Sequence, residues 1–361
     1  MLSTGGAFSV ISNGVLPPVS DVAFLAGRFI YTVSGSDRFY YSEINDAANV
    51  GGLSFATAET LPDPIVGMAI LNDEAVFFGA SSVEFWATNA DANSPLAPII
   101  GRGYQRGCAA QGSIAFVDNA LIFIGDNRVV YRTGNVPTRI SSYSIEDKLR
   151  QCANIAACTA FAATFEGHEF YVLNIPGVGA YAYDVSRIGT AAGAYGDSFE
   201  RGEWGSWASY GRVGFRGRCS ATSAGVVWVG DDTSADIWTM KSGVYTDAGG
   251  PLVRVASAFI KVEEGSPRCL NLVLHCVQGV GNAIDPGSAP VAEMRYSDDV
   301  GRTFEEWKPA SLGRRGGYGN RAIWQRLGTM RAPGRLIEIR VSDPVNVALS
   351  HLELNASRPA N

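Results

Sequence analysis

The sequence lacks several features that would place it in a common class of protein. In its 361 residues no uninterrupted apolar run approaches the length that spans a membrane, so no membrane insertion is expected. The amino terminus has no Lys or Arg before its apolar residues and does not match a secretory signal peptide. A cytoplasmic protein and a mature fragment both fit this observation.

Motifs that carry chemistry are missing too. The chain has no GxSxG turn, HExxH helix, P-loop or GxGxxG after a strand. Its three histidines, His168, His275 and His351, are scattered and are predicted to be structural. The acidic stretch 230–236 lacks the Gly and Glu spacing of an EF-hand and is interpreted as a hairpin turn. The sequence therefore predicts no catalytic residues, no metal site and no cofactor.

The cysteines form no metal-binding or redox pattern. No CxxC pair occurs, and no His lies at metal-finger spacing from any cysteine. We expect free, mostly buried thiols in a reduced compartment. The six positions are Cys108, Cys152, Cys158, Cys219, Cys269 and Cys276.

What the chain does have is a repeated pattern of short strands. The stretch 65–88 combines three runs rich in Val, Ile, Phe and Trp with short polar or small breaks, which is typical of hairpin-linked antiparallel strands. Similar stretches recur with first turns near residues 27, 73, 119, 167 and 225, at spacings of 46, 46, 48 and 58 residues. Such repeats favour the blades of a β-propeller over the alternative, a generic β-sandwich.

Three departures from the repeat are expected in the first part of the chain. Residues 1–20 form a strand or linker, in which residues 8–12 would complete the last blade. A short helix near 144–153, capped by Ser144, interrupts the blades of 21–246. The Gly- and Ala-rich segment 187–217 is expected to be a long loop insertion.

After residue 246 longer strands predict a β-sandwich-like domain over 247–361. It contains SDDVGRTF, which matches the Asp-box pattern and serves a turn rather than catalysis. Ser297 and Asp299 can bond the turn backbone, Gly301 allows a positive φ, and Phe304 is expected to anchor the hairpin in the core. The residues of this structural turn are Ser297, Asp299, Gly301, Thr303 and Phe304.

Charge is distributed unevenly along the chain. Residues 1–200 hold 10 Lys and Arg against 19 Asp and Glu, whereas residues 201–361 hold 19 against 16, and 16 of those 19 are Arg. This asymmetry suggests separate surfaces for separate partners, although arginines that pair across strands would produce it as well. Arg and Trp are common interface anchors. The candidate interface residues are Trp204, Trp207, Arg314, Arg315, Tyr318, Arg321, Trp324, Arg326 and Arg331, with Trp204 and Trp207 also able to pin the loop that holds them.

A propeller with an Asp box also raises a sialidase or other glycosidase as the alternative function. That site needs an arginine cluster for a substrate carboxylate and paired carboxylates or a Tyr nucleophile. The available arginines do not fall at equivalent positions of the repeat. They are Arg28, Arg102, Arg106, Arg128 and Arg132.

Several longer stretches carry a family resemblance in their order along the chain. They are SDRFYYSEIND, AETLPDPIVGMAILNDEAVFFGASSVEFW, ISSYSIEDKLR, GHEFYVLNIPGVGAYAYDVS and RAIWQRLGTMRAPGRLIEIRV. In these stretches the chain resembles the packaged-DNA stabilisation proteins of short-tailed bacteriophages, the P22-type tail accessory factors of the tail hub or nozzle.

The resemblance implies a non-enzymatic virion protein of the phage tail, assembled in the cytoplasm of a host bacterium. It would form a homo-hexamer ring beneath the adaptor and portal and continue the DNA channel. It would help to retain packaged DNA and contact double-stranded DNA without sequence specificity. It would also dock tail fibre, spike or needle proteins. The alternative to this whole function is a carbohydrate-active or glycan-binding propeller.

Overall fold

The computed structural model describes residues 11, 13–58, 61–91, 94–187 and 203–357. The chain forms two compact units, Met1–Ala208 with Arg212–Lys241 and Ser209–Gly211 with Ser242–Asn361. The sequence had placed this boundary between residues 246 and 247. None of the helices in the described parts is long and apolar enough to cross a membrane.

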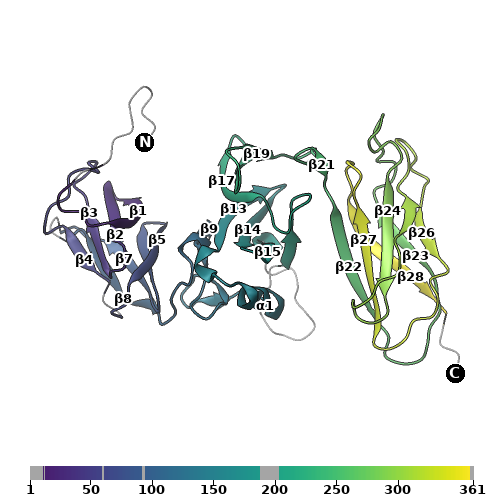
Figure 1. Cartoon of the computed structure of the whole chain (residues 1–361), viewed down its shortest axis with the longest axis horizontal. Helices are drawn as coiled ribbons and strands as arrows, with labels where there is room; N and C mark the ends of the chain where they lie inside the picture. Colours follow the sequence, from purple (N-terminus) through teal and green to yellow (C-terminus); the bar gives the residue numbers. More distant parts are fainter. Residues whose placement is uncertain (1–10, 12, 59–60, 92–93, 188–202, 358–361) are drawn as a thin grey trace. The chain divides into compact units, whose positions relative to one another are not determined.

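The first unit consists of five consecutive antiparallel sheets, drawn from purple to teal in Figure 1. Each sheet is a meander whose strands pair in chain order. Sheet 1 contains β1 (Val19–Leu25), β2 (Arg28–Val33), β3 (Arg38–Tyr41) and β4 (Phe55–Thr57). Sheet 2 contains β5 (Ile65–Leu71), β6 (Glu74–Gly79), β7 (Val83–Thr88) and β8 (Leu96–Tyr104).

The remaining sheets of this unit follow the same order. Sheet 3 contains β9 (Ala115–Val117), β10 (Ala120–Ile124), β11 (Val130–Arg132) and β12 (Thr138–Arg139). Sheet 4 contains β13 (Thr159–Phe165), β14 (His168–Ile175), β15 (Gly179–Asp184) and β16 (Glu203–Trp207). Sheet 5 has three described strands, β17 (Gly217–Ser223), β18 (Val226–Asp231) and β19 (Ile237–Met240).

The first hairpin of each sheet turns where the repeat predicted it. In sheet 1 both turn residues, Ala26 and Gly27, have left-handed φ values of 49° and 80°. Glu166 and Gly167 repeat this in sheet 4, with 52° and 82°. Two left-handed residues in succession match the twist of paired strands, which fixes the register of these hairpins.

Successive sheets bury their faces against each other. Separate apolar clusters join sheet 1 to sheet 2, sheet 2 to sheet 3, sheet 3 to sheet 4, and sheet 4 to sheet 5. The first strands of neighbouring sheets lie beside each other, as β1 does with β5 and β13 with β17. Stacking by faces around the first strands is the arrangement of propeller blades, as predicted. The strand predicted at residues 8–12 falls almost wholly outside the described residues.

The helix starts earlier than predicted. α1 spans Tyr143–Gln151, and its N-cap is Ser142, whose Oγ accepts a hydrogen bond from the Ile145 N–H at 3.4 Å. The proposed cap, Ser144, lies inside the helix. Ile145 and Leu149 are buried in the cluster between sheets 3 and 4. Short 3₁₀ turns occur at η1 (Gln111–Ser113), η2 (Ile155–Ala157) and η3 (Val185–Arg187).

The expected loop insertion 187–217 contains a strand. β16 pairs with β15 from Asp184↔Glu203 to Ala180↔Trp207 and so supplies the fourth strand of sheet 4. The Gly-rich composition concealed it, although the five residues Glu203–Trp207 include two tryptophans. Residues 188–202 lie outside the described residues.

The second unit is a β-sandwich, as predicted, preceded by the hairpin β20 (Thr246–Asp247) and β21 (Gly250–Pro251). Sheet 6 has the order β22-β27-β24-β25 and sheet 7 the order β26-β23-β28. Their facing residues, among them Leu272, Trp324, Met294 and Ile339, form one buried cluster. Sheet 6 contains β22 (Arg254–Lys261), β24 (Val291–Ser297), β25 (Lys308–Ser311) and β27 (Gly334–Val341); sheet 7 contains β23 (Cys269–Cys276), β26 (Ala322–Gln325) and β28 (Leu349–Ala356).

Candidate functional site

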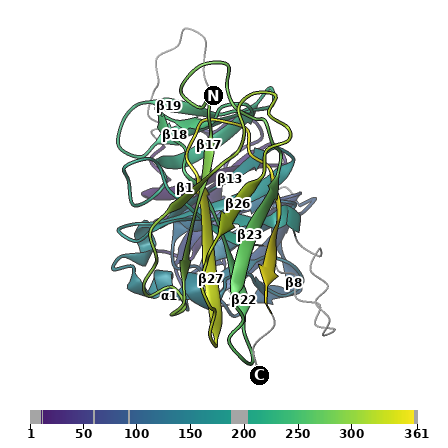
Figure 2. The same ribbon diagram turned by 90° about the vertical axis from the view of Figure 1, so that its right-hand side faces the viewer.

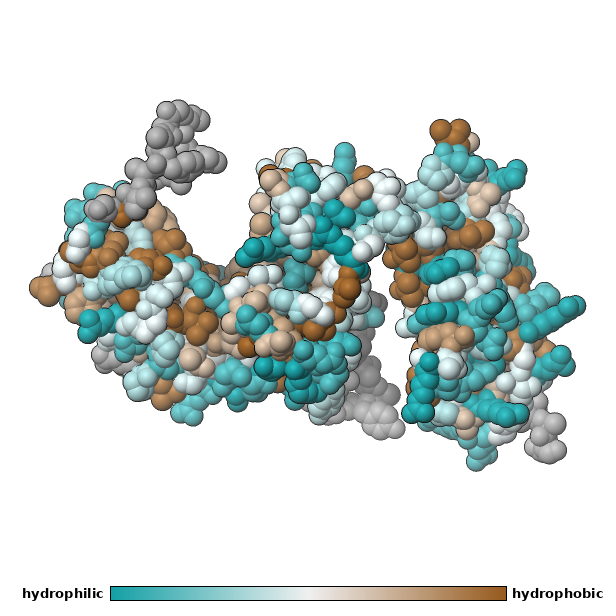
Figure 3. Space-filling view, viewed as in Figure 1, coloured by the Kyte–Doolittle hydropathy of each residue, from teal (hydrophilic) through white to brown (hydrophobic). Residues whose placement is uncertain are grey.

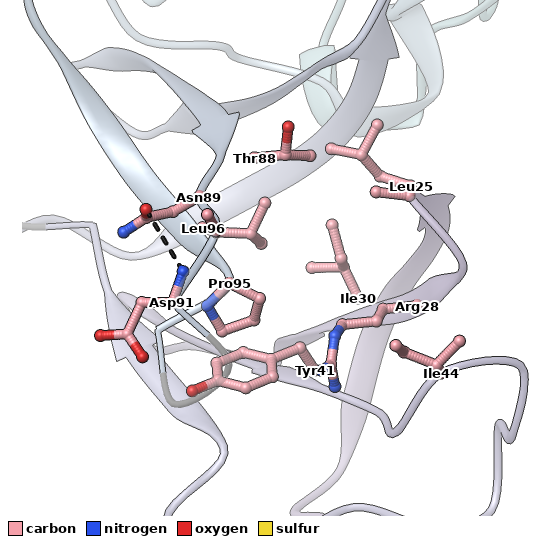
Figure 4. A pocket seen from close by; sticks show the side chains of 12 residues that line it. Leu25, Arg28, Ile30, Tyr41, Ile44, Thr88, Asn89, Asp91, Pro95 and Leu96 are labelled. Carbon is pink, nitrogen blue, oxygen red and sulfur yellow. Dashed lines mark hydrogen bonds between the residues drawn. The ribbon is translucent and has the colours of Figure 1, made fainter.

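A small pocket opens between sheets 1 and 2 of the propeller. Its volume is about 260 Å³, and its walls come from the β1–β2 turn, from β2, β3 and Ile44, and from residues 88–91 and 95–96 between β7 and β8. Figure 4 shows the Arg28 guanidinium beside Ile44 at one side and the Asp91 carboxylate at the other, with Tyr41 between them. A pocket of this size accommodates one side chain rather than an extended ligand.

The polar groups of this pocket are engaged by the protein. Arg28 donates to the Ser42 carbonyl at 2.7 Å and lies 3.6 Å from a Glu43 carboxylate oxygen. Burial raises the pKa of Tyr41, and the neighbouring Arg28 partly opposes that rise. Asp91 is the only carboxylate among the described lining residues, so the pocket holds no carboxylate pair for acid–base chemistry.

The acidic stretch 230–236 forms a hairpin turn. Asp231 Oδ1 accepts hydrogen bonds from the Thr233 N–H and hydroxyl, both at 2.9 Å, and Asp231 Oδ2 accepts one from Trp238 Nε1 at 3.0 Å. The hydrogen bonds from Thr233 are the largest cause that lowers the pKa of Asp231. Its oxygens stabilise the turn. No group of three or more potential metal-ligating side chains occurs in the described ranges.

The cysteines are free thiols, as expected. Burial raises the pKa of Cys108 to about 11, and burial beside Cys152 raises that of Cys158 to about 12. Both therefore stay protonated at neutral pH and are poor nucleophiles.

The two tryptophans predicted at an interface pack inside the propeller, Trp204 between sheets 3 and 4 and Trp207 between sheets 4 and 5. Trp204 Nε1 donates to the Ile140 carbonyl at 2.8 Å, and its ring lies 5.1 Å from that of Tyr183. Trp207 packs against Phe170 and Phe215, with ring centroids 5.3 and 5.5 Å away. Both tryptophans therefore attach their own segment to the propeller, which is the alternative to an interface role given above.

Trp324 is a core residue, which corrects its placement among the interface candidates. It is 3% exposed, and its Nε1 donates to the Lys308 carbonyl at 2.7 Å across the sandwich. On β26 its side chain points toward sheet 6, because strand residues alternate between faces and Ile323 and Gln325 occupy the outer one. The sequence alone did not show which face of this short strand is buried.

The remaining arginines of the interface stretch are exposed but do not form one continuous surface. Arg314, Arg315 and Tyr318 lie in the loop between β25 and β26, and Arg321 directly precedes β26. Arg326 directly follows β26, so it and Arg331 lie at the other end of that strand. The sandwich thus presents two basic groups, which we call the 314–321 end and the 326–331 end.

The Asp box forms the predicted turn. Asp299 Oδ1 accepts from the N–H groups of Arg302 and Thr303 at 2.9 and 2.8 Å, and Ser297 Oγ accepts from the Gly301 N–H at 2.8 Å. Gly301 has a φ of 90°, as required. The predicted role of Phe304 is wrong: its ring stacks beneath the Arg295 guanidinium, 4.1 Å away, and lies outside the buried cluster.

Sequence reasoning missed the buried partner of this turn. Arg335 is 2% exposed, and its guanidinium bonds both carboxylate oxygens of Asp298, at 2.6 and 2.8 Å. It also donates to the Leu327 carbonyl at 2.6 Å and lies 3.9 Å over the Tyr296 ring. The signal in the sequence was that Arg335 occupies the same alternate positions as the apolar residues Ile337, Ile339 and Val341 of its strand.

The arginines considered for a glycosidase site do not converge. Arg106 pairs with Asp126 at 3.0 Å, and Arg132 pairs with Asp118 at 2.9 Å. Arg128 donates to carbonyls at the end of α1, and Arg102 pairs with Glu74. Each serves its own blade.

Comparison with known proteins identifies the two units. The family described as "Bacteriophage P22 Gp10, beta-propeller" matches residues 2–245, and "Bacteriophage P22 Gp10, beta-sandwich" matches residues 253–357. The tail hub protein gp10 of Salmonella phage P22 is 24% identical over 174 residues, which cover 45% of this chain. The aligned residues span only 36% of that relative's own length.

Solved structures show only distant likeness. An exo-β-1,3-galactanase of Phanerochaete chrysosporium is 11% identical with a TM-score of 0.33, covering 98% of this chain and 100% of that one. The N-terminal domain of Nup159 is 10% identical with a TM-score of 0.26, covering 97% and 80%. Likeness at this level carries no argument about activity.

Proposed function

Since the chain belongs to the family of the bacteriophage P22 tail hub protein Gp10, we propose that it is a structural, non-enzymatic component of a phage tail. The observation that carries this proposal is the match of both units, propeller and sandwich, in the order of that family. The protein would be part of the virion and would assemble in the cytoplasm of the host bacterium.

In this role six copies form a ring beneath the adaptor and portal and extend the DNA channel. Blades whose backbone hydrogen bonds are satisfied within each sheet suit a wall that must resist internal pressure. An excess of nine acidic over basic residues in 1–200 suits a channel through which DNA moves without sticking, because like charge disfavours lasting phosphate contacts. Such a ring helps to retain packaged DNA.

Docking of other tail proteins is the second part of the proposal. The pocket between sheets 1 and 2 would take one apolar side chain of a partner, since Leu25, Ile30 and Leu96 line it. The exposed arginines at the two ends of the sandwich would contact acidic surfaces of the adaptor or of a fibre, spike or needle protein.

The first experiment measures assembly. Full-length protein, alone and with the adaptor–portal complex, would be sized by mass photometry and imaged by electron microscopy. We expect rings of six copies that bind the adaptor. A chain that stays monomeric at high concentration and ignores the adaptor contradicts the proposal.

A matched pair of variants then locates the contact. Arg314→Glu with Arg315→Glu reverses charge at the 314–321 end, and Arg326→Glu with Arg331→Glu does so at the 326–331 end. We expect one pair to weaken adaptor binding at least tenfold and the other to leave it unchanged. Unchanged assembly in both excludes these arginines from docking.

A further inference from the structure

The outer face of sheet 7 carries a groove of about 930 Å³. Figure 2 looks toward this side of the sandwich, with β23 and β26 side by side. Leu272 and Leu274 of β23 point into the core, so Asn271, Val273 and His275 point outward. The groove is therefore lined by alternate residues of three strands.

These outward side chains form two polar rows. In one row Asn271 stands opposite Gln325 on one side and Asn355 on the other, and Asn355 Nδ2 donates to Asn271 Oδ1 at 2.8 Å. In the other row the rings of His275 and His351 stack with centroids 4.2 Å apart and planes 8° apart. The amide row and the imidazole row lie at opposite ends of the groove.

Glu353 connects the two rows. Its Oε2 lies 2.9 Å from His275 Nε2, and its Oε1 accepts from Asn355 Nδ2 at 3.2 Å. The contact with His275 is the largest cause that lowers the pKa of Glu353, so the side chain remains a hydrogen-bond acceptor. The polar groups of the face are thus held in place before any ligand arrives.

Two further groups at the imidazole end have capacity to spare. Arg321 is exposed and makes no ion pair with the residues that the structure describes. Gln278 also lines the groove, and its side-chain oxygen is buried without a hydrogen-bond partner. This oxygen exposes less than 1 Å² of surface, so a donor on a ligand reaches it only after the Gln278 side chain rotates.

The polar side chains of the face suit a ligand rich in hydroxyl groups. Protein interface centres are depleted of charge and rich in aromatic residues and Met. Here the apolar lining is aliphatic, with Val273 and Ile323 at its middle and Val277 and Leu349 at the imidazole end, and the charged side chains Arg321 and Glu353 lie among it. Amide side chains both donate and accept, as a hydroxyl does, and a guanidinium binds carboxylates through two hydrogen bonds. A polyhydroxylated chain complements the amides, the imidazoles and the Glu353 carboxylate, and an acidic group on that chain complements Arg321.

We propose that this groove binds an acidic oligosaccharide. Ring hydroxyls contact the amide row and Glu353, and a sugar carboxylate lies against Arg321. We assign the ligand to a glycan of the bacterial cell surface, and that assignment rests on the proposed tail function. The binding chemistry of the groove is independent of it.

Binding is tested with full-length protein by isothermal titration calorimetry. The probes are a hexamer of galacturonic acid, an oligomer of N-acetylneuraminic acid, and neutral maltohexaose. We expect at least one acidic probe to bind with a dissociation constant below about 1 mM, and maltohexaose to bind about tenfold more weakly. No binding by either acidic probe overturns the inference.

Variants assign the site. Asn271→Ala and Gln325→Ala should each weaken acidic-probe binding about tenfold, and Arg321→Ala should remove the preference for acidic over neutral probes. Arg331→Ala, at the other end of β26, is the matched control and should bind as the parent does. Equal binding by the parent, Asn271→Ala and Arg321→Ala places the ligand elsewhere and refutes the groove.

The same variants separate this inference from the proposed function. Ring assembly measured in parallel should be unaffected by Asn271→Ala. If the parent binds the acidic probe but forms no ring, the tail function fails and the groove stands. If rings form and no acidic probe binds, the reverse holds.

Discussion

At the scale of single residues, Arg335 is expected to contribute measurably to the stability of the sandwich. Arg335→Met keeps much of the side-chain volume but leaves Asp298 and the Leu327 carbonyl without their partner. The Leu327 carbonyl loses its buried donor, which costs roughly 1–3 kcal/mol, whereas the unpaired Asp298 adds little because it is 45% exposed. We therefore expect the sandwich to lose about 1–3 kcal/mol of unfolding free energy. Denaturant unfolding followed by tryptophan fluorescence measures it.

The matched control for this variant is Arg302→Met. Arg302 is exposed in the neighbouring Asp-box turn and contributes only its backbone N–H there. Its free energy of unfolding should stay within about 0.5 kcal/mol of the parent. Equal losses in both variants would contradict the role given to Arg335.

Asp299 predicts a pH dependence. Thr303 and Ser297 hydrogen-bond its carboxylate and lower its folded pKa below the ordinary value of 3.8. The unfolded chain binds a proton first on acidification, so this stabilisation is present above about pH 4 and is lost as the pH falls further. Between pH 5 and pH 3 the Tm of the parent should fall more steeply than that of Asp299→Asn.

Glu306→Gln removes one exposed carboxylate in the same hairpin and serves as its control. Its Tm should fall with acidification as steeply as that of the parent. Parallel curves for the parent and Asp299→Asn would show that the Asp299 carboxylate has no such linkage.

The sequence predicted local backbone roles better than side-chain directions. Gly301 and the Ser297–Asp299 pair were assigned correctly because their hydrogen bonds are confined to one turn. Trp324 and Phe304 were misplaced because the buried face of a strand depends on which sheet packs against it, and that is decided by residues far away in the chain.

At the scale of elements, substitutions of the tryptophans on β16 and β26 test which side chains are packed inside the protein and which are exposed. Trp204→Ala and Trp324→Ala should each cost about 3–5 kcal/mol of unfolding free energy, because each removes a packed ring and a partly buried hydrogen bond. Tyr318→Ala should cost less than about 0.5 kcal/mol, since Tyr318 is 78% exposed. Denaturant titration of the three proteins decides, and a stable Trp324→Ala variant would contradict its burial.

The same distinction explains which element boundaries were predicted: those set by local turn residues were found, and those set by pairing with another strand were not. The five first hairpins were found from their turns because the left-handed residues are coded within the turn itself. β16 was missed because a strand at a sheet edge needs only one neighbour, β15, and a Gly-rich sequence suffices when that neighbour supplies the hydrogen bonds.

At the scale of the whole molecule, the class and the two-part organisation followed from the sequence, whereas the groove on sheet 7 did not. Its lining comes from three strands between residues 271 and 355, and no motif connects Asn271, Gln325 and Asn355 before they are paired. The basic stretch 314–331 shows the opposite case. Its arginines are close in sequence, but β26 places them at its two opposite ends.

The serial stacking of sheets 1 to 5 has a consequence for how the propeller opens. An inner sheet is covered on both faces, whereas sheet 5 has three described strands and an apolar cluster on one face. Opening should therefore start at the ends and fray inward, as in a linear array of repeats. Native-state hydrogen exchange should show that amides of β10 and β14 exchange most slowly and those of β19 fastest. A blade at the end of the series would then unfold before the blades in the middle.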